Sequence, residues 1–69
     1  MILQDNEEEV LFTDVKIEGR FHMKDYFGEA HFFKTDYMMG KCIRSEHPKY
    51  LWEYNFKFYP KQKVLIFKK

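Results

Sequence analysis

Three histidines and one cysteine are the residues of this 69-residue chain whose side chains could bind a metal or act in catalysis: His22, His31, His47 and Cys42. Imidazole and thiolate are the ligands of structural zinc sites, but those sites place them as two close pairs along the chain. Only Cys42 and His47 are close in sequence here, with four residues between them. We therefore expect no metal site and no cofactor, and we expect the histidines to be separate surface residues.

Catalysis by a nucleophile would need Cys42 as a thiolate beside a histidine base. Cys42 has the same parity as Met38 and Gly40, so a small buried core residue is the simpler interpretation. The carboxylates cluster near the N-terminus or stand singly in predicted turns, and the three glycines are too far apart to form a phosphate-binding loop. We expect that the protein is not an enzyme.

The composition predicts one small, aromatic-rich domain over residues 1–69. Eight Phe, five Tyr and one Trp supply large rings that compensate for the small core of so short a chain. A single cysteine excludes an internal disulfide framework, and no segment approaches the roughly 20 apolar residues of a membrane span. We expect a soluble cytoplasmic protein with no membrane partner.

Charge is divided unevenly along the chain. The first 40 residues contain four basic and nine acidic side chains, a net charge of −5, and residues 41–69 contain eight basic and two acidic side chains, a net charge of +6. Such a chain can neutralise itself on folding, pair with a second copy, or present one charged surface to a partner. The acidic run that begins at Asp5 predicts a mobile lead-in over residues 1–7.

Alternating apolar and polar residues predict a strand over residues 11–24, because side chains of a strand point to opposite faces in turn. A turn at residues 25–29 follows, with Gly28 able to adopt positive φ. Shorter strands are predicted at 30–34 and 37–44. Helices over residues 5–12 or 35–43 are the alternative for these less regular parts.

The C-terminal part contains the most regular alternation in the chain. The residues on one face are all aromatic: Tyr50, Trp52, Tyr54, Phe56 and Phe58. We expect a strand here with Trp52 in the core. The sequence Tyr59-Pro60-Lys61-Gln62 predicts a type I turn that leads into a last strand at 63–67, so that the chain ends in a hairpin.

These elements predict an all-β or β-dominated α+β domain, built as a small antiparallel meander, roll or barrel of five to six short strands. More rings are present than a core of this size can hide, and tyrosine and tryptophan are favoured at interfaces. We therefore expect a regulator or inhibitor that binds a protein partner stoichiometrically, of the kind made by a bacterium or its phage. The same surfaces could instead join two copies of the chain in a symmetric dimer. The expected partner-binding residues are acidic or are exposed rings: Glu7, Glu8, Glu9, Asp14, Asp25, Tyr26, Phe27, Tyr37 and Tyr59.

Nucleic-acid binding is the alternative function. Proteins that bind single strands combine basic side chains with aromatic platforms, and the last 29 residues contain eight basic side chains among many rings. A sequence pI of about 7.8 is lower than is usual for such modules. The residues expected to contact phosphates are lysines: Lys49, Lys57, Lys61, Lys63, Lys68 and Lys69.

Overall fold

The computed structural model describes residues 4–68 and contains one antiparallel sheet of six strands. Its elements are β1 (Glu7–Leu11), the 3₁₀ helix η1 (Phe12–Asp14), β2 (Arg20–Asp25), β3 (Gly28–Asp36), β4 (Met39–Ser45), β5 (Asn55–Lys57) and β6 (Lys63–Phe67). The predicted β-dominated fold of five to six short strands is confirmed, and the helical alternatives for residues 5–12 and 35–43 are wrong. In this part of the chain, no helix is long and apolar enough to cross a membrane.

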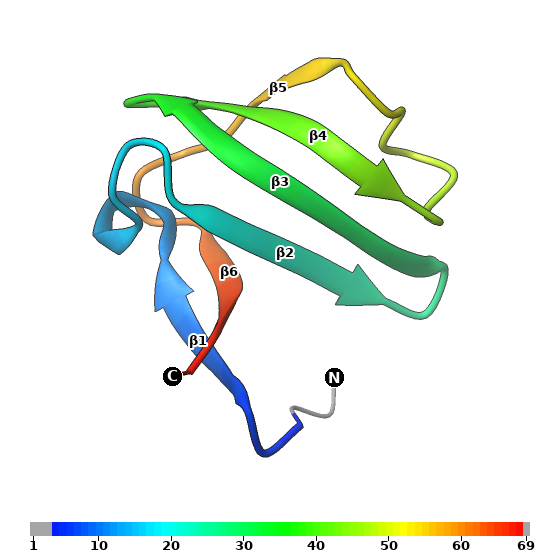
Figure 1. Ribbon diagram of the computed structural model, residues 1–69, viewed down its shortest axis with the longest axis horizontal. Helices are drawn as coiled ribbons and strands as arrows, with labels where there is room; N and C mark the ends of the chain where they lie inside the picture. Colours follow the sequence, from blue (N-terminus) through cyan, green and yellow to red (C-terminus); the bar gives the residue numbers. More distant parts are fainter. Residues whose placement is uncertain (1–3, 69) are drawn as a thin grey trace.

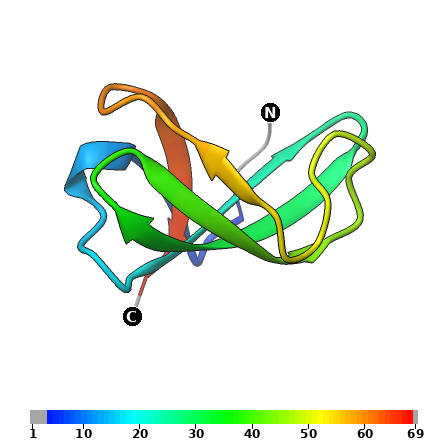
Figure 2. The same cartoon turned by 90° about the horizontal axis from the view of Figure 1, so that it is seen from above.

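The strands lie in the order β1-β6-β2-β3-β4-β5, so β2 to β5 form a meander and β6 pairs between β1 and β2 (Figure 1). Figure 2 shows that the sheet is curled. The segment between β5 and β6 closes the open side of this curl: Phe58 N donates to Met38 O at 2.8 Å, and Thr13 N donates to Pro60 O at 2.9 Å. The fold is therefore a partly closed roll.

Four phenylalanines fill the interior of the roll. Phe12, Phe21, Phe32 and Phe58 are each at most 2% exposed, and adjacent rings lie 5.0 to 5.3 Å apart in stacked or edge-to-face pairs. Rings in this geometry contribute about 0.5–1.5 kcal/mol per pair beyond the burial of their surface. Cys42 is fully buried against the same cluster, as its parity indicated.

The strand predicted over residues 11–24 is interrupted, and only its second half forms β2. The chain leaves β1 after Leu11 and turns through η1, which buries Phe12 instead of continuing the alternation. The buried ammonium group of Lys34 holds this corner, because its Nζ donates to the carbonyl oxygens of Phe12 and Val15 at 2.9 and 2.5 Å. Burying the large Phe12 ring outweighs the local strand preference.

The strand predicted from Tyr50 onward is also largely wrong, since only Asn55–Lys57 pairs as β5. Residues 51–54 form a turn in which Glu53 has a φ of 71° and its amide donates to Cys42 O at 2.8 Å. A turn reverses the backbone and breaks the parity of side chains, so the aromatic run is divided. Phe58 is core, whereas Trp52 is 64% exposed.

The predicted last strand is confirmed with its bounds, and Gln62 N donates to Tyr59 O at 3.0 Å in the predicted turn. The predicted terminal hairpin is wrong, because β6 pairs with β1 and β2 instead of β5. Val64 of β6 faces the core cluster, so burial of this strand's apolar face decides its place in the sheet.

The acidic lead-in predicted over residues 1–7 lies only partly within the described part of the chain. Residues 1–3 lie outside the described part of the chain, while Glu7 begins β1 opposite Phe67 and is buried. A carboxylate is buried only where partners satisfy it. Those partners lie on the side of the sheet that faces away from the phenylalanine core, which we call the open face.

Candidate functional site

A row of side chains crosses three adjacent strands on the open face. Strand pairing places His22 of β2 opposite His31 of β3, and His31 opposite Arg44 of β4. Directly opposed residues in antiparallel strands have Cβ atoms about 4.5–5.5 Å apart, so their side chains can interact. The expectation that the histidines are separate surface residues is therefore wrong for His22 and His31.

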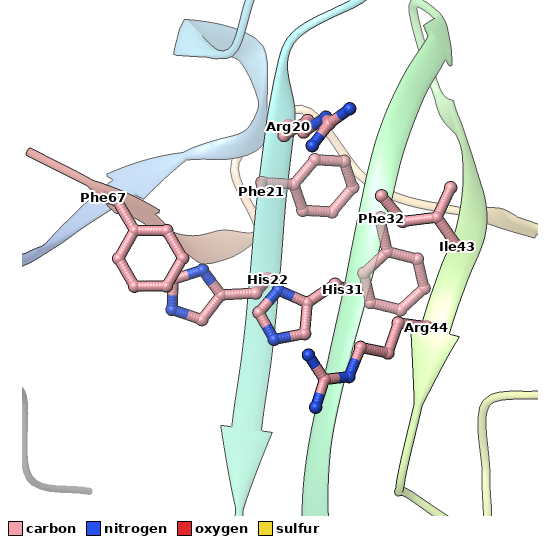
Figure 3. A pocket seen from close by; sticks show the side chains of 8 residues that line it. All are labelled: Arg20, Phe21, His22, His31, Phe32, Ile43, Arg44 and Phe67. Atoms are coloured by element: carbon pink, nitrogen blue, oxygen red, sulfur yellow. The ribbon is translucent and has the colours of Figure 1, made fainter.

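Three rings stack along this row (Figure 3). The ring of Phe67 lies 4.4 Å from that of His22, and the His22 ring lies 5.2 Å from that of His31, with 21° between the planes in each pair. His22, in the middle, is only 1% exposed, whereas Phe67 at the end of the stack is 53% exposed. The stack thus has a fixed centre and an accessible aromatic end.

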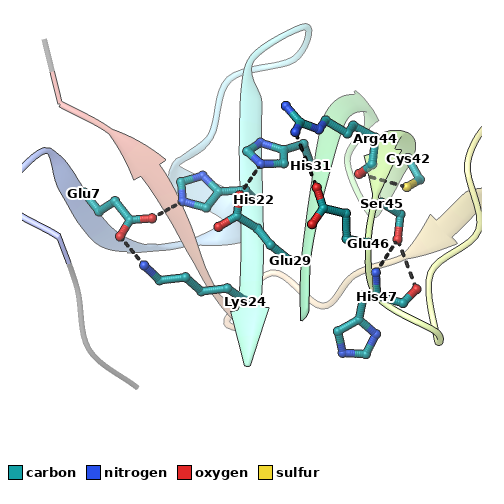
Figure 4. Close-up of polar contacts among 10 residues, drawn as sticks. All are labelled: Glu7, His22, Lys24, Glu29, His31, Cys42, Arg44, Ser45, Glu46 and His47. Carbon is teal, nitrogen blue, oxygen red and sulfur yellow. Dashed lines mark hydrogen bonds and ion pairs between the residues drawn. The ribbon is translucent and has the colours of Figure 1, made fainter. Parts of the chain in front are cut away.

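A buried carboxylate fixes the middle ring. Glu7 Oε2 accepts a hydrogen bond from His22 Nε2 at 2.5 Å, and its Oε1 accepts from Lys24 Nζ at 2.5 Å and from the backbone amide of Gln4 at 2.9 Å (Figure 4). Burial raises the pKa of Glu7, but the hydrogen bonds from Lys24, Gln4 and His22 together outweigh burial and lower it to about 2. Glu7 is therefore ionised, and it sets the orientation of the His22 ring.

His31 has a carboxylate partner of its own. Its Nε2 lies 2.6 Å from Glu29 Oε1, two residues earlier on β3, and both side chains are partly exposed. With Nε2 as the donor, the Nδ1 atom of a neutral imidazole is an acceptor. Each histidine of the row is thus hydrogen-bonded to one glutamate, and Glu7 is paired with Lys24 as well.

Two arginines provide the remaining charge on this part of the open face. Arg20 begins β2 and is exposed, and it forms no ion pair with any residue in the described range 4–68. The Arg44 side chain is 73% exposed, and it forms an ion pair at 3.4 Å with Glu46, whose side chain is equally exposed. An ion pair of this kind contributes little to stability, so both guanidinium groups can meet a ligand.

Together these side chains line a hollow of about 390 Å³ on the open face. We call it the groove, and its lining residues are Arg20, Phe21, His22, His31, Phe32, Ile43, Arg44 and Phe67. Figure 3 shows Arg20 and Arg44 at opposite ends of the hollow, with the stacked rings of His31, His22 and Phe67 to one side. A volume of this size lies within the range of small-molecule sites. The groove can therefore combine guanidinium contacts to an anion with stacking on a ring.

The predicted acidic residues do not form one surface. Glu7 is buried in the network beneath the stack, so its predicted role in docking is wrong. Glu8 and Glu9 are exposed on β1, at the edge of the sheet, while Asp14 lies in η1 and Asp25 lies at the end of β2. Because β6 separates β1 from β2, these carboxylates are distributed over different parts of the molecule.

The four aromatic residues predicted to be exposed are exposed: Tyr26, Phe27, Tyr37 and Tyr59. Only Tyr26 and Phe27 are neighbours, and they form the turn between β2 and β3 with ring centroids 5.4 Å apart. Tyr37 lies in the turn between β3 and β4, and Tyr59 lies between β5 and β6. Tyr26 is the most accessible of them, at 93% exposure.

The predicted lysines are also dispersed. Lys57 lies on the edge strand β5, whereas Lys63 lies on β6 and pairs with Glu9 at 3.9 Å. Lys49, Lys61 and Lys68 are exposed outside the strands, and Lys69 lies beyond the described residues. The basic character of the C-terminal half is thus not gathered on one surface, and the groove uses Arg20 and Arg44 instead.

His47 has a local structural role at the far end of β2. The amide of Lys49 donates to His47 Nδ1 at 3.0 Å, and His47 Nε2 donates to both carboxylate oxygens of Asp25 at 2.9 Å. The hydrogen bond from His47 lowers the pKa of Asp25. The His47–Asp25 contact connects the β2–β3 turn to the loop after β4.

In the described residues, no three His, Cys, Asp or Glu side chains are grouped so that they could hold a metal ion.

The sequence contains a signal for the histidine pair that residue types alone do not reveal. The two-residue turn Tyr26–Phe27 joins Asp25 to Gly28, and Gly28 has a φ of 144°, a backbone conformation that favours glycine. Counting outward from this turn places His22 opposite His31, as observed. The position of Arg44 could not be counted in the same way, because a bulge shifts the β3–β4 register between His31 and Phe32.

Comparisons with protein families, with curated proteins and with solved structures find no match for this chain.

Proposed function

We propose that the protein binds a phosphate-bearing ligand with a planar ring in the groove. The observation that carries this proposal is that Arg20 of β2 and Arg44 of β4 line one hollow beside the stacked rings that end in Phe67. The planar guanidinium group binds phosphate through paired, charge-assisted hydrogen bonds. Aromatic side chains with an open face are the usual platforms for nucleobases and similar rings.

The electrostatics of the groove favour an anion even though glutamates lie nearby. The charge of Glu7 is balanced by Lys24, while Glu29 accepts a hydrogen bond from His31. Among the residues that line the groove, the permanent positive charges are those of Arg20 and Arg44, and the Glu46 carboxylate that pairs with Arg44 is exposed. An anion placed between the two arginines would gain attraction from both.

Calorimetric titration with adenosine monophosphate, adenosine and inorganic phosphate tests the proposal. The nucleotide should bind more tightly than either of its parts, because only the nucleotide uses both the arginines and the ring platform. The double variant Arg20→Ala/Arg44→Ala should bind it at least tenfold more weakly, since a hydrogen bond to a charged group contributes about 1.5–3 kcal/mol and about 1.4 kcal/mol is a factor of ten.

The matched control is Lys57→Ala/Lys61→Ala, which removes the same charge from exposed positions outside the groove. It should bind the nucleotide like the unmodified protein. Equal weakening in both double variants would show that only overall charge matters and would contradict the proposal, as would the absence of nucleotide binding at millimolar concentration.

A second candidate function is the stoichiometric binding of a protein partner, as a regulator or inhibitor. It is favoured by the exposure of Tyr26 and Phe27 at a turn that the His47–Asp25 contact holds in place. Rigid exposed rings of this kind are frequent anchors of interfaces. The partner can be another protein or a second copy of this chain.

The two candidates use different surfaces and can be separated by mutation. Tyr26→Ser/Phe27→Ser should abolish a complex or a dimer measured by light scattering and leave nucleotide binding unchanged. Arg20→Ala/Arg44→Ala should have the opposite effect. A protein that remains monomeric at high concentration would exclude the second copy as the partner.

A further inference from the structure

We infer that the natural ligand of the open face is a single-stranded nucleic acid that lies across strands β2, β3 and β4. This inference rests on the proposed function and extends it, because the chemistry of the groove continues on the same face outside the hollow. A mononucleotide would use only part of this surface.

The continuation is a second row of side chains parallel to the first. Strand pairing places Arg20 opposite Phe33, and Phe33 opposite Lys41. The row lies two residues from the row of His22 and His31 along β2 and β3, which is about 7 Å at 3.3–3.4 Å per residue. Lys41 is exposed and Phe33 is half-buried, and neither lines the hollow.

Both rows combine aromatic rings with cationic side chains. The first contains the Phe67–His22–His31 stack and Arg44, and the second contains the Phe33 ring between Arg20 and Lys41. Each row thus offers one ring system for a base and at least one cation for a phosphate. A polymer that repeats a base and a phosphate matches a surface that repeats a ring and a cation.

This arrangement favours single strands over duplexes. Stacking on a protein ring requires an exposed base face, and the bases of a duplex are already stacked on one another. The contact should also depend on salt, because three cations would neutralise phosphates. At about 0.7 per phosphate for a single strand, the logarithm of the affinity should fall with a slope of about 2 against the logarithm of the salt concentration.

Fluorescence anisotropy with labelled hexanucleotides of deoxyuridine and of uridine, which differ only in the 2′-hydroxyl group, tests the inference. A duplex of mixed sequence and adenosine monophosphate are the comparisons. The hexanucleotides should bind at least tenfold more tightly than the mononucleotide and the duplex. Whichever sugar gives the tighter complex identifies the nucleic acid as DNA or RNA.

Lys41→Gln is the decisive variant, because Lys41 contributes to the second row only. It should weaken hexanucleotide binding several-fold and lower the salt slope by about 0.7, while adenosine monophosphate binds as before. Lys61→Gln, an exposed charge away from the open face, is the matched control and should change neither. Circular dichroism of both variants verifies that the sheet is intact.

The outcomes distinguish this inference from the proposed function. If the mononucleotide binds in an Arg44-dependent manner but the hexanucleotide binds no more tightly, the polymer is excluded and the ligand is a small phosphate compound. Equal binding of duplex and single strand, or equal effects of Lys41→Gln and Lys61→Gln, would also overturn the inference. If neither the mononucleotide nor the hexanucleotide binds, both proposals fail.

Discussion

Replacing Glu7 by glutamine should destabilise the protein strongly at neutral pH and hardly at all near pH 2. The Glu7 side chain is 3% exposed and accepts hydrogen bonds from His22, Lys24 and the backbone of Gln4. Its pKa of about 2, against an ordinary 4.5, means that folding favours the ionised carboxylate. Each unit of difference in pKa corresponds to about 1.4 kcal/mol of folding free energy. After a reduction for screening by water, ionised Glu7 should stabilise this small sheet by about 2–3 kcal/mol.

The direction of the pH dependence follows from the lowered pKa. The stabilisation by ionised Glu7 is complete above pH 4.5 and is lost as the pH falls from 4.5 towards 2, because the carboxylate then becomes protonated in the folded state as well. The unfolding free energies of the protein and of Glu7→Gln should therefore converge over this interval. At pH 7 they should differ by a large part of the total stability, which for a domain of this size is about 3–10 kcal/mol.

Urea unfolding followed by circular dichroism between pH 2.5 and pH 7 measures this difference. At about 1 kcal/mol per molar urea, the midpoint at pH 7 should fall by about 2 M or more. Glu8→Gln is the matched control, since Glu8 is the adjacent residue on β1 and is exposed. Equal losses in both variants, or a difference that does not close on acidification, would refute the argument that the Glu7 network stabilises the fold.

Three further predictions concern positions where burial differs from what residue type suggests. Trp52→Ala should change the unfolding free energy by less than about 1 kcal/mol, whereas Phe58→Ala should lower it by about 3–5 kcal/mol, because only loss of the Phe58 ring leaves a cavity. Urea unfolding of the two variants measures both changes, and similar losses would place Trp52 in the core. The Cys42 thiol should react with a thiol reagent far more slowly in the folded protein than in urea, since burial raises the pKa of the thiol and excludes the reagent. Fast labelling of the native protein would contradict the burial of Cys42. Gly28→Ala should lower the unfolding free energy by at least about 1 kcal/mol, because Gly28 has a φ of 144° and an added Cβ would lie 2.6 Å from Glu46 O. An unchanged midpoint of thermal unfolding would argue against the backbone conformation described for this turn.

Local pattern was sufficient for part of the fold. The last strand begins and ends where alternation and the Tyr59–Gln62 turn predict it, and Gly28 marks the turn that sets the β2–β3 register. Prediction failed where a side chain had to be buried against the local preference, as at Phe12. It also failed where a turn without typical turn residues divided a regular alternation, as at Glu53.

The candidate site depended still more on long-range pairing. Arg44 reaches the groove because of a bulge in the β3–β4 pair, and Phe67 reaches it because β6 is inserted between β1 and β2. Neither event has a local signal. The lysines that composition emphasised are dispersed for the same reason, since β5 and β6 are neighbours in sequence but lie far apart in the sheet order.

By itself, the sequence determined that this chain forms short antiparallel strands around a core of aromatic rings, since alternation, turn residues and ring content act locally. The tertiary structure decided which face of each strand is covered and which strands meet. A strand with alternating residues has two faces, and its own residues do not determine which other elements will pack on either face. That choice belongs to the pairing of the whole sheet, which buried Glu7 and His22 and left Arg20, Arg44 and Phe67 accessible on the open face.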